Sequence, residues 1–284
     1  MRRVIFNQKG GVGKSSITAN LAAISASKGL KTLVVDLDTQ ANTTQYLLGV
    51  PATDLECSIA NLFEQSISFS IFAKEPFDFV HETDYPNLFV LPSHPELEHL
   101  ESKLESRYKI FKLRDALEKL ESEGFDEIYI DTPPALNFYT RSALIAANRC
   151  LIPFDCDDFS RQALYSLLNT LQEIREDHND GLEVEGIVAN QFQPRANLPQ
   201  QLLKELVEEG LPVLPVFLSS SVKMRESHQQ SAPLIHMAAS HKLTQQFVEL
   251  FDYIDESAKS KKKSTKAKKR GSAKSTTKKG SKAV

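Results

Sequence analysis

The sequence predicts an α/β fold, a doubly wound and mainly parallel sheet flanked by helices, followed by a disordered basic C-terminal tail. Short runs rich in Val, Ile, Leu and Phe alternate with longer amphipathic segments through most of the chain, which is typical of parallel strands covered on both faces. The last 28 of the 284 residues hold 12 of the 34 Lys and Arg residues and none of the 37 acidic ones. Residues 1–256 therefore carry a net charge of −15 and are expected to form one domain, with the tail at 257–284.

Seven strands are expected, each a short apolar run bounded by polar or turn-forming residues. They lie at residues 3–6, 32–37, 87–91, 127–131, 150–154, 184–190 and 213–217. Because these runs are largely apolar rather than alternating, their strands should be buried on both faces of the sheet.

Helices fill most of the intervals between these strands. They are expected at residues 15–28, 96–122, 138–148, 160–177, 198–209 and 240–256. In the second of them, Leu113, Leu117 and Leu120 recur at the spacing that places side chains on one helical face. Residues 42–84 are less regular and are expected to mix helix and loop.

The tail differs in composition from the rest of the chain. Besides its basic residues it contains only Ser, Thr, Ala, Gly and one Val, with no aromatic residue. It buries too little apolar surface to offset the entropy of ordering, so disorder is expected from residue 257 onward. Its charge suits DNA, and anionic lipid, the acidic domain of the same chain and mere solubilisation remain alternatives. Lipid is disfavoured because the tail has no apolar face.

Composition excludes several classes of protein. Hydrophobic residues make up 41% of the chain, which excludes collagen-like and mostly disordered classes. Cys57, Cys150 and Cys156 form no CxxC pattern, so reduced thiols and a cytoplasmic location are expected. The seven histidines show no metal-binding spacing. The apolar start ends at Asn7, too early for a signal peptide, and no run approaches the ~20 apolar residues of a membrane-spanning helix.

A glycine-rich loop follows the first expected strand. It reads NQKGGVGKSS over residues 7–16, and three of the chain's 11 glycines fall within four positions. Glycine lets backbone N–H groups approach a phosphate closely, and the positive end of the following helix points at the same place. We expect the loop to bind a nucleotide through Lys9, Gly10, Gly11, Val12, Gly13, Lys14, Ser15 and Ser16.

The loop matches a variant of the common phosphate-binding pattern. Gln8 stands where GxxxxGK[ST] has its first glycine, and what matches is KGGxGK[ST], with Lys9 as an additional lysine. Lys14 can reach the β- and γ-phosphates, and the Ser15 hydroxyl can ligate Mg²⁺. The alternative is a glycine-rich turn before an ordinary helix, but the strand–loop–helix context favours phosphate binding.

Three motifs together resemble the ParA/MinD superfamily of partition ATPases, and most closely its short ParA or Soj-like members. Residues 7–16 are similar to the deviant Walker A motif, VVDLDTQAN at 34–42 to switch I, and FDEIYIDTPP at 125–134 to Walker B and switch II. The likeness covers most of residues 1–256. It implies a P-loop NTPase fold of the deviant Walker A type, with ATP and Mg²⁺ as cofactors and Mg²⁺-dependent ATP hydrolysis.

In this family the additional lysine crosses a dimer interface to the nucleotide of the partner, and Lys9 is the matching residue. The resemblance thus implies an ATP-dependent sandwich homodimer in which Lys9, Lys14 and Asp38 are catalytic. Thr39 and Ala41 replace the Pro and Gly usual in this switch I, which is expected to alter its mobility and the hydrolysis rate.

Three carboxylates belong beside the loop. Asp36 and Asp38 lie two residues apart at the end of the second strand and share a face of the extended chain. Asp131 ends the fourth expected strand, and ligands bind at such carboxyl ends in doubly wound sheets. By resemblance Asp38 orients the attacking water, while Ser15, Asp36 and Asp131 hold or support Mg²⁺. Helix caps or solvated strand ends are the alternative.

Other site residues are implied by the resemblance. Asn190 ends a strand where this family reads the adenine base, although a strand-ending Asn also suits a turn or a cap. Family members bind DNA through basic residues in regions that match Arg195, Lys223 and Arg225, and QFQPR at 191–195 departs from the family pattern. A solvated surface is the alternative for these charges. The expected DNA contacts in the tail are Lys261, Lys262, Lys263, Lys268, Lys269 and Arg270.

The resemblance implies a function in positioning. An ATP-bound dimer would bind DNA non-specifically, and a ParB-like or other activating partner would stimulate hydrolysis, so that a plasmid, chromosome or protein-cluster cargo is moved. The expected location is the cytoplasm, at the nucleoid. One alternative is a MinD-like membrane-cycling regulator, which the tail disfavours. Another is a metabolic or metallocluster enzyme on the same fold, although no cysteine lies between Cys57 and Cys150 to ligate a cluster.

Overall fold

The computed structural model describes residues 1–68, 73–156, 161–193 and 197–276, without the side chains of residues 161 and 261–276. Its strands form one sheet in the order β3-β4-β2-β5-β1-β6-β7. All neighbours pair in parallel except the edge strand β3, which is antiparallel to β4. The strands are β1 (Arg2–Ile5), β2 (Thr32–Asp36), β3 (His81–Glu82), β4 (Leu88–Leu91), β5 (Glu127–Asp131), β6 (Arg149–Asp155) and β7 (Glu183–Asn190).

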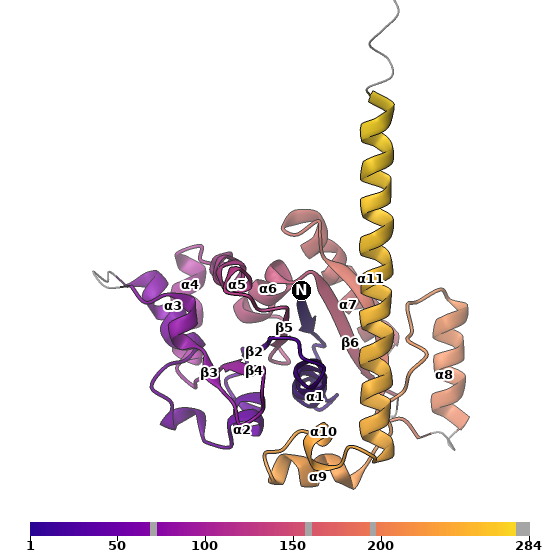
Figure 1. The fold of residues 1–284 in the computed structure, drawn as a ribbon, viewed down its shortest axis with the longest axis horizontal. Helices are drawn as coiled ribbons and strands as arrows, with labels where there is room; N and C mark the ends of the chain where they lie inside the picture. The colour runs from indigo at the N-terminus through magenta and orange to yellow at the C-terminus, as the bar shows by residue number, and fades with distance from the viewer. Residues whose placement is uncertain (69–72, 157–160, 194–196, 277–284) are drawn as a thin grey trace, which may run out of the picture.

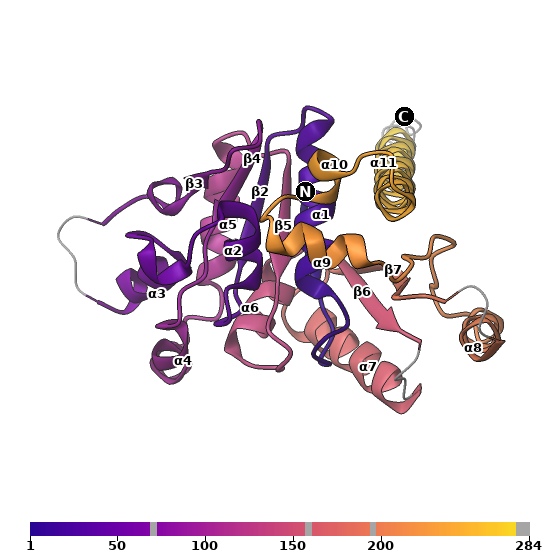
Figure 2. The same cartoon turned by 90° about the horizontal axis from the view of Figure 1, so that it is seen from below.

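Helices cover both faces of this sheet, as Figures 1 and 2 show. One face packs against α3 (Ile59–Ile67), α4 (Leu97–Ser106), α5 (Lys112–Ser122), α6 (Phe138–Ala146), α7 (Arg161–Asp177) and α8 (Asn197–Glu208). The other packs against α1 (Lys14–Ser27), α2 (Asn42–Leu48), α9 (Val222–Gln229), α10 (Leu234–Met237) and α11 (Lys242–Thr276). Short 3-10 turns lie at η1 (Ala52–Asp54) and η2 (Pro76–Phe79). The three layers confirm the predicted fold class, and the mixed character expected of residues 42–84 is confirmed as well.

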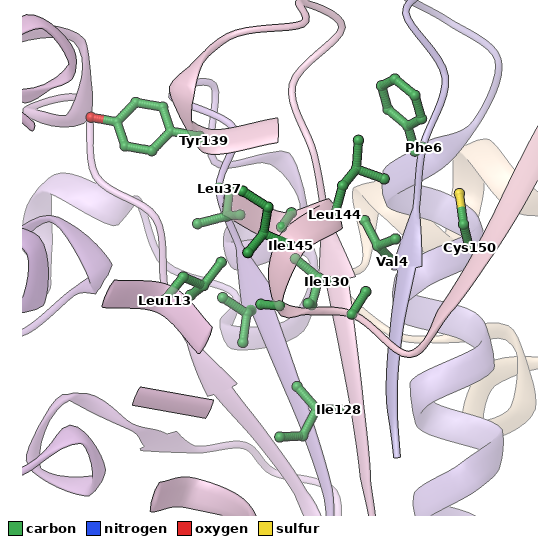
Figure 3. Packing of buried hydrophobic residues seen from close by; sticks show 14 of the residues in the cluster. Val4, Phe6, Leu37, Leu113, Ile128, Ile130, Tyr139, Leu144, Ile145 and Cys150 are labelled. Carbon is green, nitrogen blue, oxygen red and sulfur yellow. The ribbon is translucent and has the colours of Figure 1, made fainter. Parts of the chain in front are cut away.

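Two apolar cores separate the layers. Figure 3 shows part of the first, in which Val4 of β1 and Ile128 and Ile130 of β5 face Leu113 of α5 and Ile145 of α6. The alternate residues Ile5 and Tyr129 belong to the core on the other face, because successive side chains of a strand point to opposite sides. Burial on both faces explains why these strands read as continuous apolar runs.

The chain leaves neighbouring strands towards opposite faces. β1 pairs with β6, yet α1 packs on one face of the sheet and α7 on the other. The loops after β1 and β6 therefore diverge, and a crevice is expected at the carboxyl ends of these strands. The glycine-rich loop lies at this point.

The single helix predicted over 96–122 was wrong, because the structure has α4 and α5 there. Tyr108 adopts a left-handed conformation with φ 55° between them. Leu104 and Leu113 are nine residues apart, about two and a half helical turns, so one straight helix would place their two leucine stripes on opposite sides. The break lets both stripes face the core.

The strand predicted at 213–217 was also wrong. This segment follows β7 closely, with Leu214 N–H donating to the Ile187 carbonyl and Leu218 N–H to the Ala189 carbonyl, each at 2.8 Å. The structure has only isolated bridges there, at Val213 and Ser219. Pro215 lacks the N–H that a continuous ladder needs, so the apolar run stays irregular.

The tail also differs from expectation. Disorder was predicted from residue 257, but α11 continues to Thr276 and extends well past the other elements in Figure 1. Ala258 is still buried against the domain, so packing passes the predicted boundary at residue 256. Lys and Ala are good helix formers and no proline interrupts this helix, so helix propensity prevails where packing ends. No helix in the described part of the chain is long and apolar enough to cross a membrane.

Candidate functional site

The glycine-rich loop joins β1 to α1, and its backbone requires glycine at two positions. Gly11 and Gly13 have φ of 77° and 88°, a left-handed region that residues with a Cβ rarely adopt. Gly13 is the N-cap of α1, so the first free N–H groups of that helix point into the loop. Such a turn presents backbone donors to an anion, as expected for a phosphate-binding loop.

Lys14 is held inside this loop. Its side chain is buried, and its Nζ donates a hydrogen bond to the Lys9 carbonyl at 2.9 Å. Burial lowers the pKa of Lys14, and the nearby carboxylates of Asp131 and Asp38 oppose this effect. Lys9 itself stands half-exposed on the loop. Both predicted lysines therefore lie on one short turn, with Lys14 facing the acids.

Asp36 and Asp131 lie side by side at the carboxyl ends of β2 and β5, where they are direct register partners. Both are fully buried. Burial and the charge of Asp131 raise the pKa of Asp36 to about 8. Burial also raises the pKa of Asp131 to about 6, although the Ser15 and Thr43 hydroxyls oppose the rise. Two buried carboxyl groups this close to one another favour a cation between or beside them.

The residues present fit a magnesium site that is completed by other ligands. Asp131 Oδ2 accepts a hydrogen bond from the Thr43 hydroxyl at 2.7 Å, whereas Oδ1 is buried and has no hydrogen-bond partner in the described structure. A buried oxygen without a partner is costly unless something else satisfies it. The described residues contain no cluster of three or more His, Cys, Asp or Glu side chains that could hold a metal. That is usual for Mg²⁺, which takes one or two carboxylates together with phosphates and water.

Asp38 lies just beyond β2 and is nearly buried. Its Oδ1 accepts a hydrogen bond from the Gln40 N–H at 3.0 Å, and its carbonyl accepts one from the Ser93 hydroxyl at 2.6 Å. Its charge acts on Lys14 and on Asp131. The structure thus brings all three predicted carboxylates, together with Lys14, to one end of the sheet.

Asn190 closes the loop from the end of β7. Its Nδ2 donates to the Val12 carbonyl at 2.9 Å, and a Cβ added to Gly13 would lie 2.2 Å from that nitrogen. The next residue, Gln191, donates from Nε2 to the Gly11 carbonyl at 3.1 Å. The predicted base-reading residue therefore lies against the loop, and a second amide that was not predicted supports the same turn.

A cavity of about 410 Å³ opens beside the loop. Gly11, Gly13 and Ser16 form one wall, and Asn190 another. The segment before α9 and the side chains of Arg225 and His228 complete it. It is large enough for a nucleoside and joins the phosphate-binding turn directly.

Comparison with known proteins identifies the family. Residues 3–184 match a family described as an AAA domain, AAA_31. The chain is 35% identical over 237 residues to the chromosome partitioning protein ParA of Myxococcus xanthus, which covers 81% of this chain and 79% of that protein. This chain belongs to the ParA/MinD superfamily of partition ATPases.

Solved structures share the fold of this chain. Cobyrinic acid a,c-diamide synthase from Mycobacterium smegmatis, with bound ATP analog and magnesium, has a TM-score of 0.76 and 25% identity and covers 89% of this chain and 93% of that one. The cell division ATPase MinD of Pyrococcus furiosus has a TM-score of 0.71 and 25% identity, covering 90% and 98%. The likeness confirms the P-loop NTPase fold of this ParA/MinD chain.

Two threonines of this ParA/MinD chain escaped prediction. They lie in α2, which begins at the last residue of the segment that resembles switch I (34–42) and is called the switch I helix here. Thr43 binds Asp131, and Thr44 binds Asp36 through both its hydroxyl, at 2.7 Å, and its N–H, at 2.9 Å. Ser93 continues the chain of contacts, because its N–H donates to the Thr44 hydroxyl at 2.9 Å. Adjacent threonines so soon after Asp36 and Asp38 are the signal that could have indicated them, since hydroxyls at a helix start often bind local acceptors.

The predicted DNA contacts are only partly placed. Lys223 is half-exposed and pairs with Glu226 at 2.5 Å within α9. Arg225 is exposed and lines the cavity beside the loop. Arg195 lies outside the described residues. The predicted DNA contacts of the tail, between residues 261 and 270, belong to α11, and the structure describes only their backbone.

Proposed function

We propose that this chain is a ParA-like ATPase that forms an ATP-dependent sandwich dimer, binds DNA non-specifically and positions a cargo. The observation that carries the proposal is the meeting of one short turn, with Lys9 and Lys14, and a pair of buried carboxylates, Asp36 and Asp131. The lysines and the backbone N–H groups of the loop can bind phosphates, and the two carboxylates can bind a cation. Together they form a site for a nucleotide with its magnesium ion.

Each residue has a role in this proposal. The N–H groups of the loop and Lys14 bind the phosphates, and the cavity beside Asn190 takes the nucleoside. Ser15, Asp36 and Asp131 hold Mg²⁺, which supplies charge neutralisation at the phosphates. Asp38, two residues beyond the end of β2, orients water for attack on the γ-phosphate. Thr43 and Thr44 keep the carboxylates aimed at that space.

The proposed dimer depends on Lys9. This lysine stands half-exposed on the loop, whereas Lys14 bends back to the Lys9 carbonyl and serves its own site. A cation offered from one subunit to the nucleotide of the other makes dimerisation depend on the γ-phosphate. Two domains that each carry a net charge of −15 repel one another, so such a cation is needed at their interface.

We predict that Lys9→Gln keeps nucleotide binding but loses the ATP-dependent dimer and ATP turnover. The amide cannot neutralise charge across the interface, and loss of such a group costs about 10³-fold or more in rate. Light scattering and phosphate release, each with and without ATP and Mg²⁺, measure the two effects. Lys103→Gln, which removes the same charge from an exposed position on α4, is the control and should behave as the unmodified chain. A Lys9→Gln chain that dimerises normally with ATP would show that the role is misassigned.

Cargo release follows from the same cycle. A ParB-like or other partner would stimulate hydrolysis, and loss of the γ-phosphate would free the dimer from DNA. The cargo is a plasmid, a chromosome or a protein cluster, and the place of action is the nucleoid in the cytoplasm. The likeness to the Myxococcus xanthus ParA supports this class of function.

A metabolic enzyme is the second candidate, and the likeness to a cobyrinic acid a,c-diamide synthase favours it. By its name such an enzyme makes a diamide from an organic acid, and that structure holds an ATP analog with magnesium. It would not need DNA or a protein activator for turnover. ATP hydrolysis that DNA and a partner leave unchanged, but that a small acid stimulates, would favour this candidate over the first.

A further inference from the structure

A buried polar cluster lies beneath the nucleotide cavity and joins three helices. Ser16 and Asn20 belong to α1, Tyr46 belongs to α2, and Ser227 and His228 belong to α9. Asn20, Tyr46 and Ser227 are almost completely buried. Residues more than 200 positions apart meet here, although the roles assigned above to the nucleotide site do not require His228.

His228 makes two different contacts at once. Its Nε2 is 2.8 Å from the Ser16 hydroxyl of the phosphate-binding loop. Its ring stacks on Tyr46, with centroids 4.1 Å apart and planes inclined by 23°. One edge of the imidazole therefore binds the loop while one face packs on the switch I helix. Burial lowers the pKa of His228, which keeps the ring neutral near pH 7 and able to share a single hydrogen bond with a hydroxyl.

The remaining contacts lock Tyr46 to α1 and α9. The Tyr46 hydroxyl is hydrogen-bonded to the Ser227 hydroxyl, and Asn20 Nδ2 donates to it at 3.2 Å. The same Nδ2 donates to the Ser16 carbonyl at 2.9 Å. Tyr46 of α2 contacts α9 through both its ring face and its hydroxyl. A shift of α9 therefore moves α2 as well.

The switch I helix also contacts the two metal-site carboxylates, which lie at the ends of β2 and β5. Thr43 and Thr44 lie within the same turn as Tyr46 and bind Asp131 and Asp36. A contact at Tyr46 is therefore transmitted through one rigid turn of helix to the two acids. Ser16 lines the same cavity as His228, next to the phosphate-binding turn.

We propose that His228 is a positioning residue, which couples nucleotide binding at the Ser16 hydroxyl to the switch I helix α2 and to α9. The inference rests on the proposed function, because it requires a nucleotide in the loop. When a nucleotide's phosphates engage the backbone and hydroxyl of Ser16, His228 keeps its bond to that residue and orders Tyr46 through the stack. Nucleotide binding thereby changes the order of α2 and of α9, the surface helix that bears Lys223 and Arg225.

Two substitutions separate the two contacts of His228. His228→Phe keeps a ring to stack on Tyr46 and loses the hydrogen bond to Ser16. His228→Gln keeps a polar group for Ser16 and loses the ring. The matched control is His236→Gln, because His236 stacks on Tyr85 at 4.2 Å and 16° in the same way but contacts no residue of the loop in the described structure.

The experiment combines ADP affinity, measured by calorimetry, with amide hydrogen exchange of residues 42–48 and 222–229, with and without ADP and Mg²⁺. In the unmodified chain and in His236→Gln, ADP should slow exchange in both segments. His228→Phe should bind ADP about fivefold more weakly, the effect of one neutral hydrogen bond. His228→Gln should bind ADP within about twofold of the unmodified chain, since its amide can replace that bond, yet lose the added protection of residues 42–48. Unchanged exchange in the core strands β1 and β5 verifies folding.

Three outcomes would overturn the inference. One is normal ADP affinity in His228→Phe together with normal protection of α2 in His228→Gln. The second is an equal loss in His236→Gln, which would mark a general packing effect. The third is exchange in β1 or β5 that rises in both His228 variants, which would show that His228 supports the fold rather than the coupling. Absence of ADP binding by the unmodified chain would contradict the proposed function itself, whereas the other results leave the ATPase standing.

Discussion

At the scale of single residues, the site depends on ionisable groups that are buried at a cost in free energy. Asp36 and Asp131 are buried acids, and Lys14 is a buried lysine. Their sequence motifs predicted that they would meet, because each motif has a fixed place after a strand. Thr43, Thr44, Gln191 and His228 were not predicted, since a short polar side chain shows its partner only when distant strands and helices are assembled.

Ala41 stores strain in switch I. It stands where the family usually has glycine, and it adopts φ 52°, a left-handed conformation. We predict that Ala41→Gly raises the free energy of unfolding by about 1 kcal/mol, because glycine adopts this conformation without steric penalty. Urea unfolding measures the change. Ala116→Gly, in the regular helix α5, is the control with the opposite sign and should lose about 1 kcal/mol or more. Equal destabilisation by both changes would show that the strain at Ala41 is negligible.

At the scale of elements, the elements that position the site were the best predicted. β1, the glycine-rich loop and α1 followed from an apolar run, a glycine cluster and a helix-forming segment in immediate succession. The expectations that were wrong lie farther from the loop. A leucine pattern does not show where a helix must break so that both leucine stripes face the core. The run at 213–217 contains Pro215, a signal against a continuous strand that its apolar residues obscured.

The joint between the loop and α1 tolerates no side chain at Gly13. Its φ is 88°, and an added Cβ would lie 2.2 Å from Asn190 Nδ2. We predict that Gly13→Ala lowers the unfolding free energy by more than about 1 kcal/mol from backbone strain alone, and displaces Asn190. Gly10→Ala is the control within the same loop, because no atom lies within 4 Å of its added Cβ. Thermal unfolding of the two variants without nucleotide should separate them. If both unfold at the same temperature, the close approach of Asn190 does not constrain the loop.

At the scale of the whole molecule, charge is divided between an acidic domain and a basic C-terminal segment. The sequence predicted this division, but it did not predict that α11 would carry the segment outward as a helix to Thr276. Helix propensity without packing is a weak signal, and a composition poor in apolar residues argued for disorder. Lys223 pairs with Glu226, and Arg225 lines the cavity beside the loop, which makes the tail the stronger proposal for DNA contacts.

We predict that removing residues 261–284 abolishes most non-specific DNA binding while leaving the ATPase intact. The cut falls after Ala258, the last described residue that is buried against the domain. If about half of the tail cations touch phosphates, log affinity should fall with log salt at a slope of roughly −5 for the full chain. A second variant keeps the helix but replaces its charges with glutamine at Lys261, Lys262, Lys263, Lys268, Lys269 and Arg270. Sedimentation with duplex DNA, or with anionic vesicles, measures both variants with and without ATP. Unchanged DNA binding by the truncated chain, or vesicle binding by the full chain, would contradict the prediction.

The helical arm also sets a distance. Residues 261–276, if they rise as a helix, span about 24 Å, whereas electrostatic repulsion fades over about 8 Å at physiological ionic strength. Under the proposed function, DNA bound along this arm would lie beyond the range of repulsion from the acidic domain. If the chain dimerises and binds DNA as proposed, two such helices would hold the DNA at a distance from both nucleotide sites.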